Sequence, residues 1–221
     1  MKHHIFTAAA VMLLLTGCAD TAAHSSETPA EYSAAALPAA DRPAPDTALY
    51  SAAKPGDTVS FGGYDWYITG RSENTVELLC KTTVCVMPYH NEKGDITWEN
   101  CSLRQYLNTE FYLSFTDAER ALIVQTHCEN PDNTEFGSAT PGGNATDDYV
   151  YLPSMEEARA LPEALRVCDR YWWLRSPGKH RYYAAGVYSS GVIDPLGYYT
   201  DYADYESAVR PALRLMLADT E

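Results

Sequence analysis

Two apolar runs near the C-terminus frame this sequence, YWWLRSPG at residues 171–178 and AVRPALRL at residues 208–215. Between them, the 24 residues from Tyr182 to Tyr205 hold 7 of the chain's 17 tyrosines. A core cannot accept so many phenols close together, because each buried hydroxyl needs a hydrogen-bond partner. We therefore predict that the two runs build a stiff β scaffold and that the tyrosine-rich segment between them faces solvent.

This segment also contains aspartate, serine and glycine. Antibody combining sites have a similar composition, because rigid amphipathic rings supply contact area and small polar residues supply adaptable hydrogen bonds. The alternative interpretation is a set of ordinary strand and loop positions, since tyrosine is a good strand former. The pattern predicts a ligand-binding surface with these candidate residues: Tyr182, Tyr183, Tyr188, Asp194, Tyr198, Tyr199, Asp201, Tyr202, Asp204 and Tyr205.

Length and composition predict one globular domain with accessory segments. The chain has 221 residues, of which 46% are hydrophobic and 21% are charged, as in proteins that bury a core. Its formal net charge is −14. A nucleic acid needs a basic footprint and an anionic lipid surface needs cationic side chains, so this charge argues against both partners.

The N-terminus has the pattern of an export signal. Lys2 precedes the apolar run Ile5–Leu15, whose eleven residues are too few to span a bilayer as a mature helix. The next residues, Leu15-Thr16-Gly17-Cys18, resemble the lipobox of bacterial lipoproteins, which implies a signal peptide at residues 1–17 and lipidation of Cys18. The expected location is the cell membrane, facing outside the cytoplasm, with contact only through the lipid. An ordinary secretory signal with an incidental cysteine is the alternative.

A disordered tether is predicted for residues 18–54. Ala19–Lys54 contains 13 alanines and 4 prolines and has no sustained apolar periodicity, so it has little to bury. The globular domain is predicted at residues 55–217, followed by a tail at residues 218–221.

Alternation of apolar residues predicts several short strands and turns within the domain. Pro211 cannot donate to a ladder, which predicts an edge strand or a bulge at that position. The expected strands cover residues 58–69, 75–80, 83–87, 149–152 and 209–217, with a turn or bulge at Gly62-Gly63 and a turn over residues 194–197. A hairpin over residues 186–194 is expected to turn at Ser189-Ser190-Gly191.

Capping residues predict three short helices. Ser102 is expected to begin the first helix and Asn108 to end it. A capping box at Thr116 predicts a second helix over residues 120–125, and another at Ser154 predicts a helix that ends near Ala160. Strands, then helices, then many short strands indicate an α+β fold.

The cysteines give only weak signals of chemistry. The five cysteines of the domain form no C-x-x-C pair and have no zinc-ligand spacing: Cys80, Cys85, Cys101, Cys128 and Cys168. Cys80 and Cys85 could bridge a tight hairpin, but small buried residues are the preferred interpretation. Cys128 beside His127 is a weak hint of an activated thiol.

No catalytic residue, metal or cofactor is assigned from the sequence, which contains no G-x-S-x-G, HExxH or Gly-rich phosphate loop. The oxygen-rich loop at residues 128–148 could hold calcium, but its spacing matches no EF-hand, so a solvated loop is preferred. Arg175 and Arg210 each lie beside apolar residues, and we predict that their guanidinium groups pair with buried carboxylates or carbonyls.

Several motifs resemble an uncharacterised bacterial domain family, and they include ITWEN at residues 96–100, WWLRSPG at residues 172–178 and VRPAL at residues 209–213. The resemblance runs from residue 55 to residue 217. More distantly, the layout is similar to the C-type-lectin-like fold of formylglycine-generating-type proteins and of variable proteins diversified by retroelements. Those variable proteins present a C-terminal patch rich in Tyr, Asp, Ser and Asn, whereas the patch here lacks Asn.

The resemblance implies a single C-type-lectin-like α+β domain with short antiparallel strands and two to three short helices. Together with the N-terminal pattern, it predicts a monomeric, lipid-anchored surface protein whose Tyr/Asp-rich face binds a protein or glycan ligand. An enzyme with an unrecognised, cysteine-based site and a structural envelope module are the alternatives.

Overall fold

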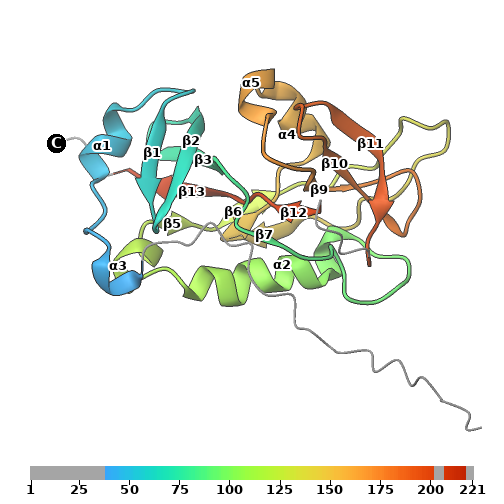
Figure 1. Ribbon diagram of the computed structural model, residues 1–221, viewed down its shortest axis with the longest axis horizontal. Coiled ribbons are helices and arrows are strands. Elements are labelled where there is room, and N and C mark those ends of the chain that lie inside the picture. Colours follow the sequence, from blue (N-terminus) through green and yellow to red (C-terminus); the bar gives the residue numbers. More distant parts are fainter. Residues whose placement is uncertain (1–37, 202–206, 218–221) are drawn as a thin grey trace, which may run out of the picture. The chain divides into compact units, whose positions relative to one another are not determined.

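The domain is built around two sheets, shown in Figure 1 for the computed structural model, which describes residues 38–201 and 207–217. The first sheet has the order β1-β2-β3-β13-β5, and β8 also pairs with β13. Gly62 and Gly63 form the turn between β1 and β2 with φ angles of 62° and 83°, which such a tight hairpin requires. The strands are β1 (Thr58–Phe61), β2 (Tyr64–Arg71), β3 (Thr75–Cys80), β5 (Ile123–Val124), β8 (Val150–Tyr151) and β13 (Ala212–Met216).

The second sheet has the order β11-β10-β9-β12-β4. β9 is buried at every position, which is why its sequence reads as a nearly continuous apolar run. β12 lies parallel to β9, and the other pairs are antiparallel. The strands are β4 (Cys85–Val86), β9 (Trp172–Pro177), β10 (Tyr183–Val187), β11 (Ile193–Tyr199) and β12 (Ala208–Val209).

Arg210 and Pro211 carry the chain from the second sheet to the first. β12 ends before them and β13 begins after them, so the predicted single strand over residues 209–217 is two strands in different sheets. The expectation of an edge strand is wrong, because β13 pairs on both sides. Pro211 is tolerated at this junction because its missing N–H falls between two ladders, while its carbonyl accepts from Cys80 N at 2.9 Å.

Arg210 fills the junction and is fully buried. Its Nε donates to the Cys80 carbonyl at 2.7 Å, and its guanidinium lies 5.0 Å from the centre of the Trp172 ring. Arg175 is also buried and donates to the Glu157 carboxylate and to backbone carbonyls such as that of Leu152. The predicted structural roles of both arginines are confirmed.

Short helices cover the sheets. The helical segments are η1 (Ala39–Asp41), α1 (Thr47–Ala52), η2 (Trp98–Asn100), α2 (Ser102–Tyr106), η3 (Leu107–Phe111), α3 (Asp117–Arg120), α4 (Met155–Ala160) and α5 (Glu163–Arg166). Helix α4 buries Met155 and Ala158 against Trp172, Leu174 and Val187, which lie on one face of the second sheet. A small separate sheet pairs β6 (Thr126–Cys128) with β7 (Thr146–Asp148).

The capping boxes at Thr116 and Ser154 are present as predicted, but several helix boundaries differ. Cys101, not Ser102, caps α2 by accepting from Arg104 N. Asn108 does not end that helix, which continues as the π-helix η3. The Asn108 side-chain amide instead donates to Val150 O at 2.9 Å and accepts from Tyr149 N at 2.8 Å. These tertiary contacts occupy the side chain that was expected to end the helix.

The predicted second helix over residues 120–125 is also wrong. Helix α3 covers Asp117–Arg120, and Ile123–Val124 instead forms β5, which pairs with β13. Two β-branched residues suit a sheet surface better than a helix.

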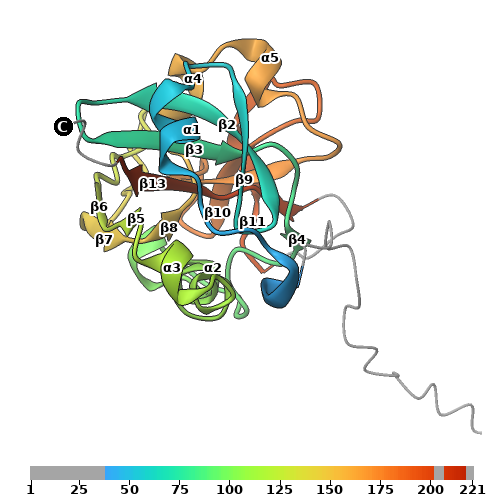
Figure 2. The ribbon, with the colours of Figure 1, turned by 90° about the vertical axis from the view of Figure 1, so that its left-hand side faces the viewer.

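Residues 38–54 do not form the end of a disordered tether, and the domain begins before residue 55. Asp46 caps α1, and α1 lies against the first sheet in Figure 2. Tyr50 is 2% exposed and packs edge-on to Phe61 with the ring centres 6.1 Å apart. Arg42 donates to Gly62 O at 2.6 Å and pairs with Glu119. The alanine-rich composition predicted disorder, but one aromatic side chain, that of Tyr50, is enough to attach this segment to the core.

The predicted α+β class is confirmed: antiparallel pairing dominates, and the helices are short. They are more numerous than the two or three expected, since five α-helical segments occur in the described part of the chain. None of the helices within residues 38–201 and 207–217 is long and apolar enough to cross a membrane.

Candidate functional site

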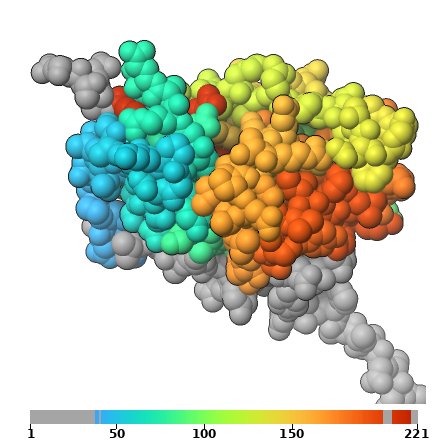
Figure 3. Space-filling view, turned by 90° about the horizontal axis from the view of Figure 1, so that it is seen from above, coloured from blue at the N-terminus to red at the C-terminus, as the bar shows by residue number. Residues whose placement is uncertain are grey.

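The hairpin of β10 and β11 presents most of the predicted binding residues. Its turn lies at Ser189–Ser190, as expected, with Gly191 N donating to Tyr188 O at 2.8 Å. The predicted turn over residues 194–197 is wrong, because these residues continue β11 through a bulge between the Gly186–Asp194 and Ala184–Tyr198 pairs. β11 is an edge strand of the second sheet, and the orange to red atoms of the hairpin lie on the surface in Figure 3.

Four tyrosines of this region are exposed to similar extents. The exposed fractions are 37% for Tyr182, 40% for Tyr188, 41% for Tyr198 and 45% for Tyr199. Tyr198 and Tyr199 are neighbours in β11, and their side chains therefore point to opposite faces of the sheet. The candidate residues thus form two groups rather than one continuous face.

The first group, which we call the Asp194 cluster, consists of Tyr171, Tyr188, Asp194 and Tyr198. The Tyr171 ring meets the Tyr198 ring at 4.9 Å and 86°, and the Tyr188 ring at 5.5 Å and 72°. Tyr171 occupies the space above Gly186, where a Cβ atom would lie 2.1 Å from its Cζ. Tyr171 and Asp194 are each only 5% exposed, so the two exposed rings cover a buried phenol and a buried carboxylate.

Burial and the nearby carboxylate set the proton affinities in the Asp194 cluster. Burial, followed by the charge of Asp194, raises the pKa of Tyr171. The same two causes raise the pKa of Tyr188 to about 12. The Asp194 carboxylate accepts from Leu196 N at 3.1 Å. Tyr171 and Tyr188 are therefore neutral hydroxyl groups at physiological pH.

The second group, which we call the His180 stack, consists of His180, Tyr182, Tyr183 and Tyr199. Tyr182 is stacked on His180 at 5.3 Å and 9°, and on Tyr199 at 5.7 Å and 21°. Tyr183 meets all three rings at a steep angle. A hydrogen bond with Tyr199 is the largest cause that raises the pKa of Tyr183 to about 12. This stack presents ring edges, outer ring faces and phenolic hydroxyls to solvent.

Of the remaining candidates, one is buried, one is exposed and three cannot be placed. Asp194 is buried rather than on the surface, while Asp201 is exposed. Tyr202, Asp204 and Tyr205 lie outside the described residues. Sequence reasoning missed Tyr171, because it belongs to an apolar run and was assigned to the scaffold. Gly186 was the available signal, since a glycine inside a strand often marks the close approach of another group.

Comparison with protein families identifies the domain. A family described as "Domain of unknown function (DUF6273)" matches residues 73–217. The chain belongs to this family. The match includes both apolar runs and the whole hairpin, which agrees with the expected membership of an uncharacterised domain family. A search of curated proteins and a search of solved structures each gave no match.

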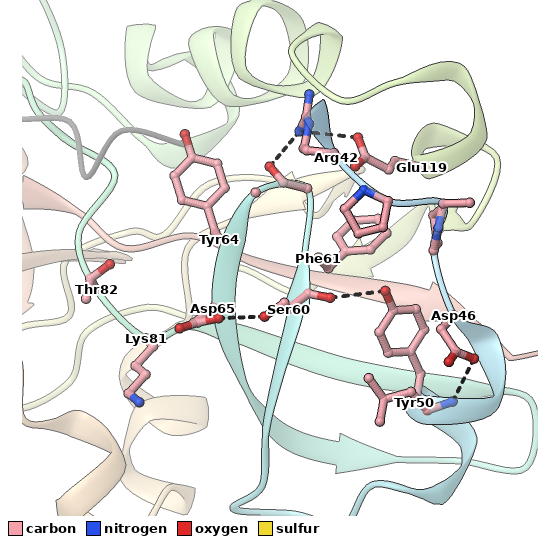
Figure 4. A pocket seen from close by; sticks show the side chains of 16 residues that line it. Arg42, Asp46, Tyr50, Ser60, Phe61, Tyr64, Asp65, Lys81, Thr82 and Glu119 are labelled. Carbon is pink, nitrogen blue, oxygen red and sulfur yellow. Dashed lines mark hydrogen bonds and ion pairs between the residues drawn. The ribbon is translucent and has the colours of Figure 1, made fainter. Parts of the chain in front are cut away.

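A separate cleft of about 810 Å³ lies mostly outside the matched residues (Figure 4). It runs between residues 42–50 and the β1–β2 hairpin. Several of its polar side chains are paired with one another or with the backbone: Ser60 Oγ donates to Asp65 at 2.7 Å, and Tyr50 Oη donates to Ser60 O at 3.1 Å. These pairings stabilise the N-terminal segment on the sheet.

The cysteines do not form an activated site. The five thiols within the described residues are free, so Cys80 and Cys85 are not bridged. Burial raises the pKa of Cys128 to about 12, which keeps it as an unreactive thiol. His127 points away from it into solvent and bonds Asp147 at 2.8 Å, because adjacent strand residues face opposite sides. The geometry therefore argues against the proposed Cys128–His127 pair.

Several polar side chains of loop 128–148 are partnered within the protein. Asp148 accepts from Trp98 Nε1 at 2.9 Å and Arg104 Nε at 2.7 Å. Asn133 donates to Pro177 O and Pro195 O, which attaches the loop to β9 and β11. The described residues contain no group of acidic, His or Cys side chains that could hold a metal ion.

Proposed function

We propose that this protein is an exported, lipid-anchored binding module that holds a protein or glycan ligand on the β10–β11 hairpin. The observation that supports this best is the exposure of Tyr182, Tyr188, Tyr198 and Tyr199, each between 37% and 45%, on one hairpin. Tyrosine offers a large apolar ring with a polar end, which suits it to surfaces that exchange water for a ligand. Such rings also lose little conformational freedom on binding.

The scaffold supports this proposal because it fixes both ends of the displayed segment. The two apolar runs that bracket the tyrosines are neighbouring strands, and Ala208 in β12 pairs with Trp172 in β9. This arrangement also motivates the finer part of the proposal, a C-type-lectin-like fold in which a rigid frame presents a C-terminal binding segment. Preorganisation of this kind increases affinity by reducing the ordering cost of binding.

The His180 stack suits a glycan or an aromatic or aliphatic side chain. The apolar face of a ligand ring could pack on the outer face of Tyr199, while the Tyr182 and Tyr183 hydroxyls are available to polar groups at its edge. The net charge of −14 disfavours an anionic ligand such as nucleic acid. The lipobox-like residues before Cys18 motivate the proposed anchor and the location outside the cytoplasm.

Binding to a glycan array and to a peptide array tests the proposal. Two double variants are compared with the wild type: Tyr188→Ala/Tyr198→Ala and Tyr182→Ala/Tyr199→Ala. We expect at least one of them to bind an array ligand of the wild-type protein about tenfold more weakly or worse. Tyr112→Ala is the matched control. Tyr112 lies outside the hairpin and stacks on Tyr149, with the two ring centres 4.5 Å apart. If both double variants fold and capture every wild-type ligand unchanged, the hairpin is not the binding surface.

The anchor has a separate test. Metabolic labelling with a fatty-acid probe in a bacterial host is expected to label the wild-type protein and not the Cys18→Ser variant. Equal labelling of the two would show that Cys18 does not carry the lipid.

A further inference from the structure

Asp194 is a buried carboxylate without a cationic partner. It is 5% exposed, and the ion pairs formed within residues 38–201 and 207–217 do not include it. Its carboxylate accepts from the Leu196 N–H at 3.1 Å and lies beside the Tyr171 and Tyr188 hydroxyls, which are neutral donors. A charge in this position is costly unless it is paired, so Asp194 is a site at which a cation would be stabilised.

The adjacent Tyr171 hydroxyl is only weakly satisfied, because its contact with the Asp194 carboxylate falls outside normal hydrogen-bond geometry although it contributes to the raised pKa of the hydroxyl. It is buried and makes no hydrogen bond of normal geometry within the described part of the protein. The side chain is 5% exposed, and the charge of Asp194 contributes to the raised pKa of its hydroxyl. Buried polar groups without partners are rare in proteins and often mark a position that a ligand completes. A donor from a ligand could satisfy the Tyr171 oxygen and the Asp194 carboxylate together.

The two exposed rings of the Asp194 cluster complete an environment for a positive charge. Tyr188 and Tyr198 flank Tyr171 with their ring planes at 72° and 86° to its plane, so three aromatic rings meet edge to face in the cluster that contains Asp194. The faces of aromatic rings are negative and attract cations. Each flanking ring is about 40% exposed.

From these contacts we infer that the Asp194 cluster binds a primary ammonium group of the ligand. The inference rests on the proposed function and names the ligand chemistry at one part of that surface. A primary ammonium is compact and carries three donors, which can reach the Asp194 carboxylate and the Tyr171 oxygen together. A quaternary ammonium has no donor for Tyr171, and a guanidinium is a wide planar fork. The protein's charge of −14 also attracts a cation.

A primary ammonium can come from a lysine side chain or from an amino sugar, and paired probes distinguish these sources. The first pair is a short lysine peptide and the same peptide with acetyl-lysine. The second pair is a glucosamine tetramer and its N-acetylated form. Acetylation removes the charge and two donors while it keeps the rest of each probe. Binding is followed by NMR titration of the full-length protein in low salt.

We expect one free-amine probe to bind at least about tenfold more tightly than its acetylated form, a difference that corresponds to one ion pair in a partly buried site. Asp194→Asn keeps the shape and the acceptor for Leu196 N, and it should weaken that binding by about tenfold. Tyr171→Phe should weaken it several-fold without loss of thermal stability, since the deleted hydroxyl makes no hydrogen bond of normal geometry. Asp147→Asn and Tyr149→Phe are the matched controls away from the hairpin.

The inference fails if neither free-amine probe binds with a Kd below about 10 mM, or if each binds no better than its acetylated form. It also fails if folded Asp194→Asn and Tyr171→Phe both bind the free amine as the wild type does. These outcomes differ from failure of the proposed function, in which the tyrosine-to-alanine double variants keep every ligand. A third outcome separates the two proposals: the double variants lose their array ligands, but Asp194→Asn binds the free amine as the wild type does. The hairpin would then still be the binding surface, but it would contain no ammonium site at Asp194.

Discussion

Ala208 lies beside Trp172 in the only parallel pairing among the described strands, that of β12 with β9. The chain between these two strands contains the whole β10–β11 hairpin, so its two ends are held side by side in the centre of one sheet. A segment with fixed ends loses less conformational freedom on binding than a free loop of the same length. Stability at this junction should therefore be necessary for the tyrosine surface.

Replacement of Arg210 tests the junction directly. Arg210→Ala removes the donor to Cys80 O and the contact with the Trp172 ring, and it leaves a cavity between the sheets. We expect a loss of about 3 kcal/mol or more in the free energy of unfolding, measured by urea denaturation. The control is Arg214→Ala, which removes a half-exposed pair with Glu77 and should cost no more than about 1 kcal/mol. Equal costs would show that the buried guanidinium does not join the sheets.

Gly186 determines whether Tyr171 can occupy its place. In Gly186→Ala the new Cβ would lie 2.1 Å from the Tyr171 ring, so the ring or the strand must move. We expect a loss of about 1–3 kcal/mol in urea denaturation, together with altered NMR signals of Tyr188 and Tyr198. The same change in a Tyr171→Ala background should cost less, because the clash is then absent. Identical costs in both backgrounds would mean that Gly186 is needed for another reason.

Local patterns in the sequence predicted the parts of the fold that depend on neighbouring residues. The capping boxes at Thr116 and Ser154 and the hairpin turn at residues 189–191 each involve groups a few positions apart, and all three are present. The apolar run at residues 171–178 likewise predicted part of a β scaffold, and β9 lies there. These signals are strong because the geometry that they specify is local.

Features that depend on distant partners were not predictable in the same way. Pro211 reads as a break within one strand, and only the pairing of β13 with β3 and β5 shows that the chain changes sheets there. Asp194 reads as a surface residue until the bulge in β11 places it under Tyr188 and Tyr198. The clash that explains Gly186 requires its partner Tyr171, which is remote along the chain.

The buried thiols predict resistance to alkylation and a loss of stability in alkali. Burial raises the pKa of Cys80, Cys101 and Cys128 from 9.0 to about 12. At pH 8 their thiolate fraction is then roughly 1,000-fold smaller than in the unfolded chain, so iodoacetamide should modify them only after urea is added. Because the folded pKa is the higher one, the stabilisation from each neutral thiol is complete below pH 9 and is lost as the pH rises toward about 12.

Peptide mapping by mass spectrometry measures the alkylation, and denaturation curves at several pH values measure the stability. Rapid native modification of Cys128 at pH 8 would contradict its burial and would restore the cysteine-based enzyme as a hypothesis. Cys85 is less buried than these three, and burial raises its pKa to about 11, so it gives an internal comparison with an intermediate rate.

Tyr50 and its neighbour Leu49 decide whether residues 38–54 belong to the folded domain. Tyr50 is 2% exposed in helix α1 and contacts Phe61, whereas Leu49 is 50% exposed. Tyr50→Ala should lower the free energy of unfolding by about 3 kcal/mol, because it empties a site in the core, and Leu49→Ala should change it by less than about 0.5 kcal/mol. Both variants place alanine within α1, so its helical propensity contributes little to the difference. Urea denaturation of the full-length variants measures both values. If Tyr50→Ala costs as little as Leu49→Ala, residues 38–54 do not contribute to the folded domain and belong to the tether.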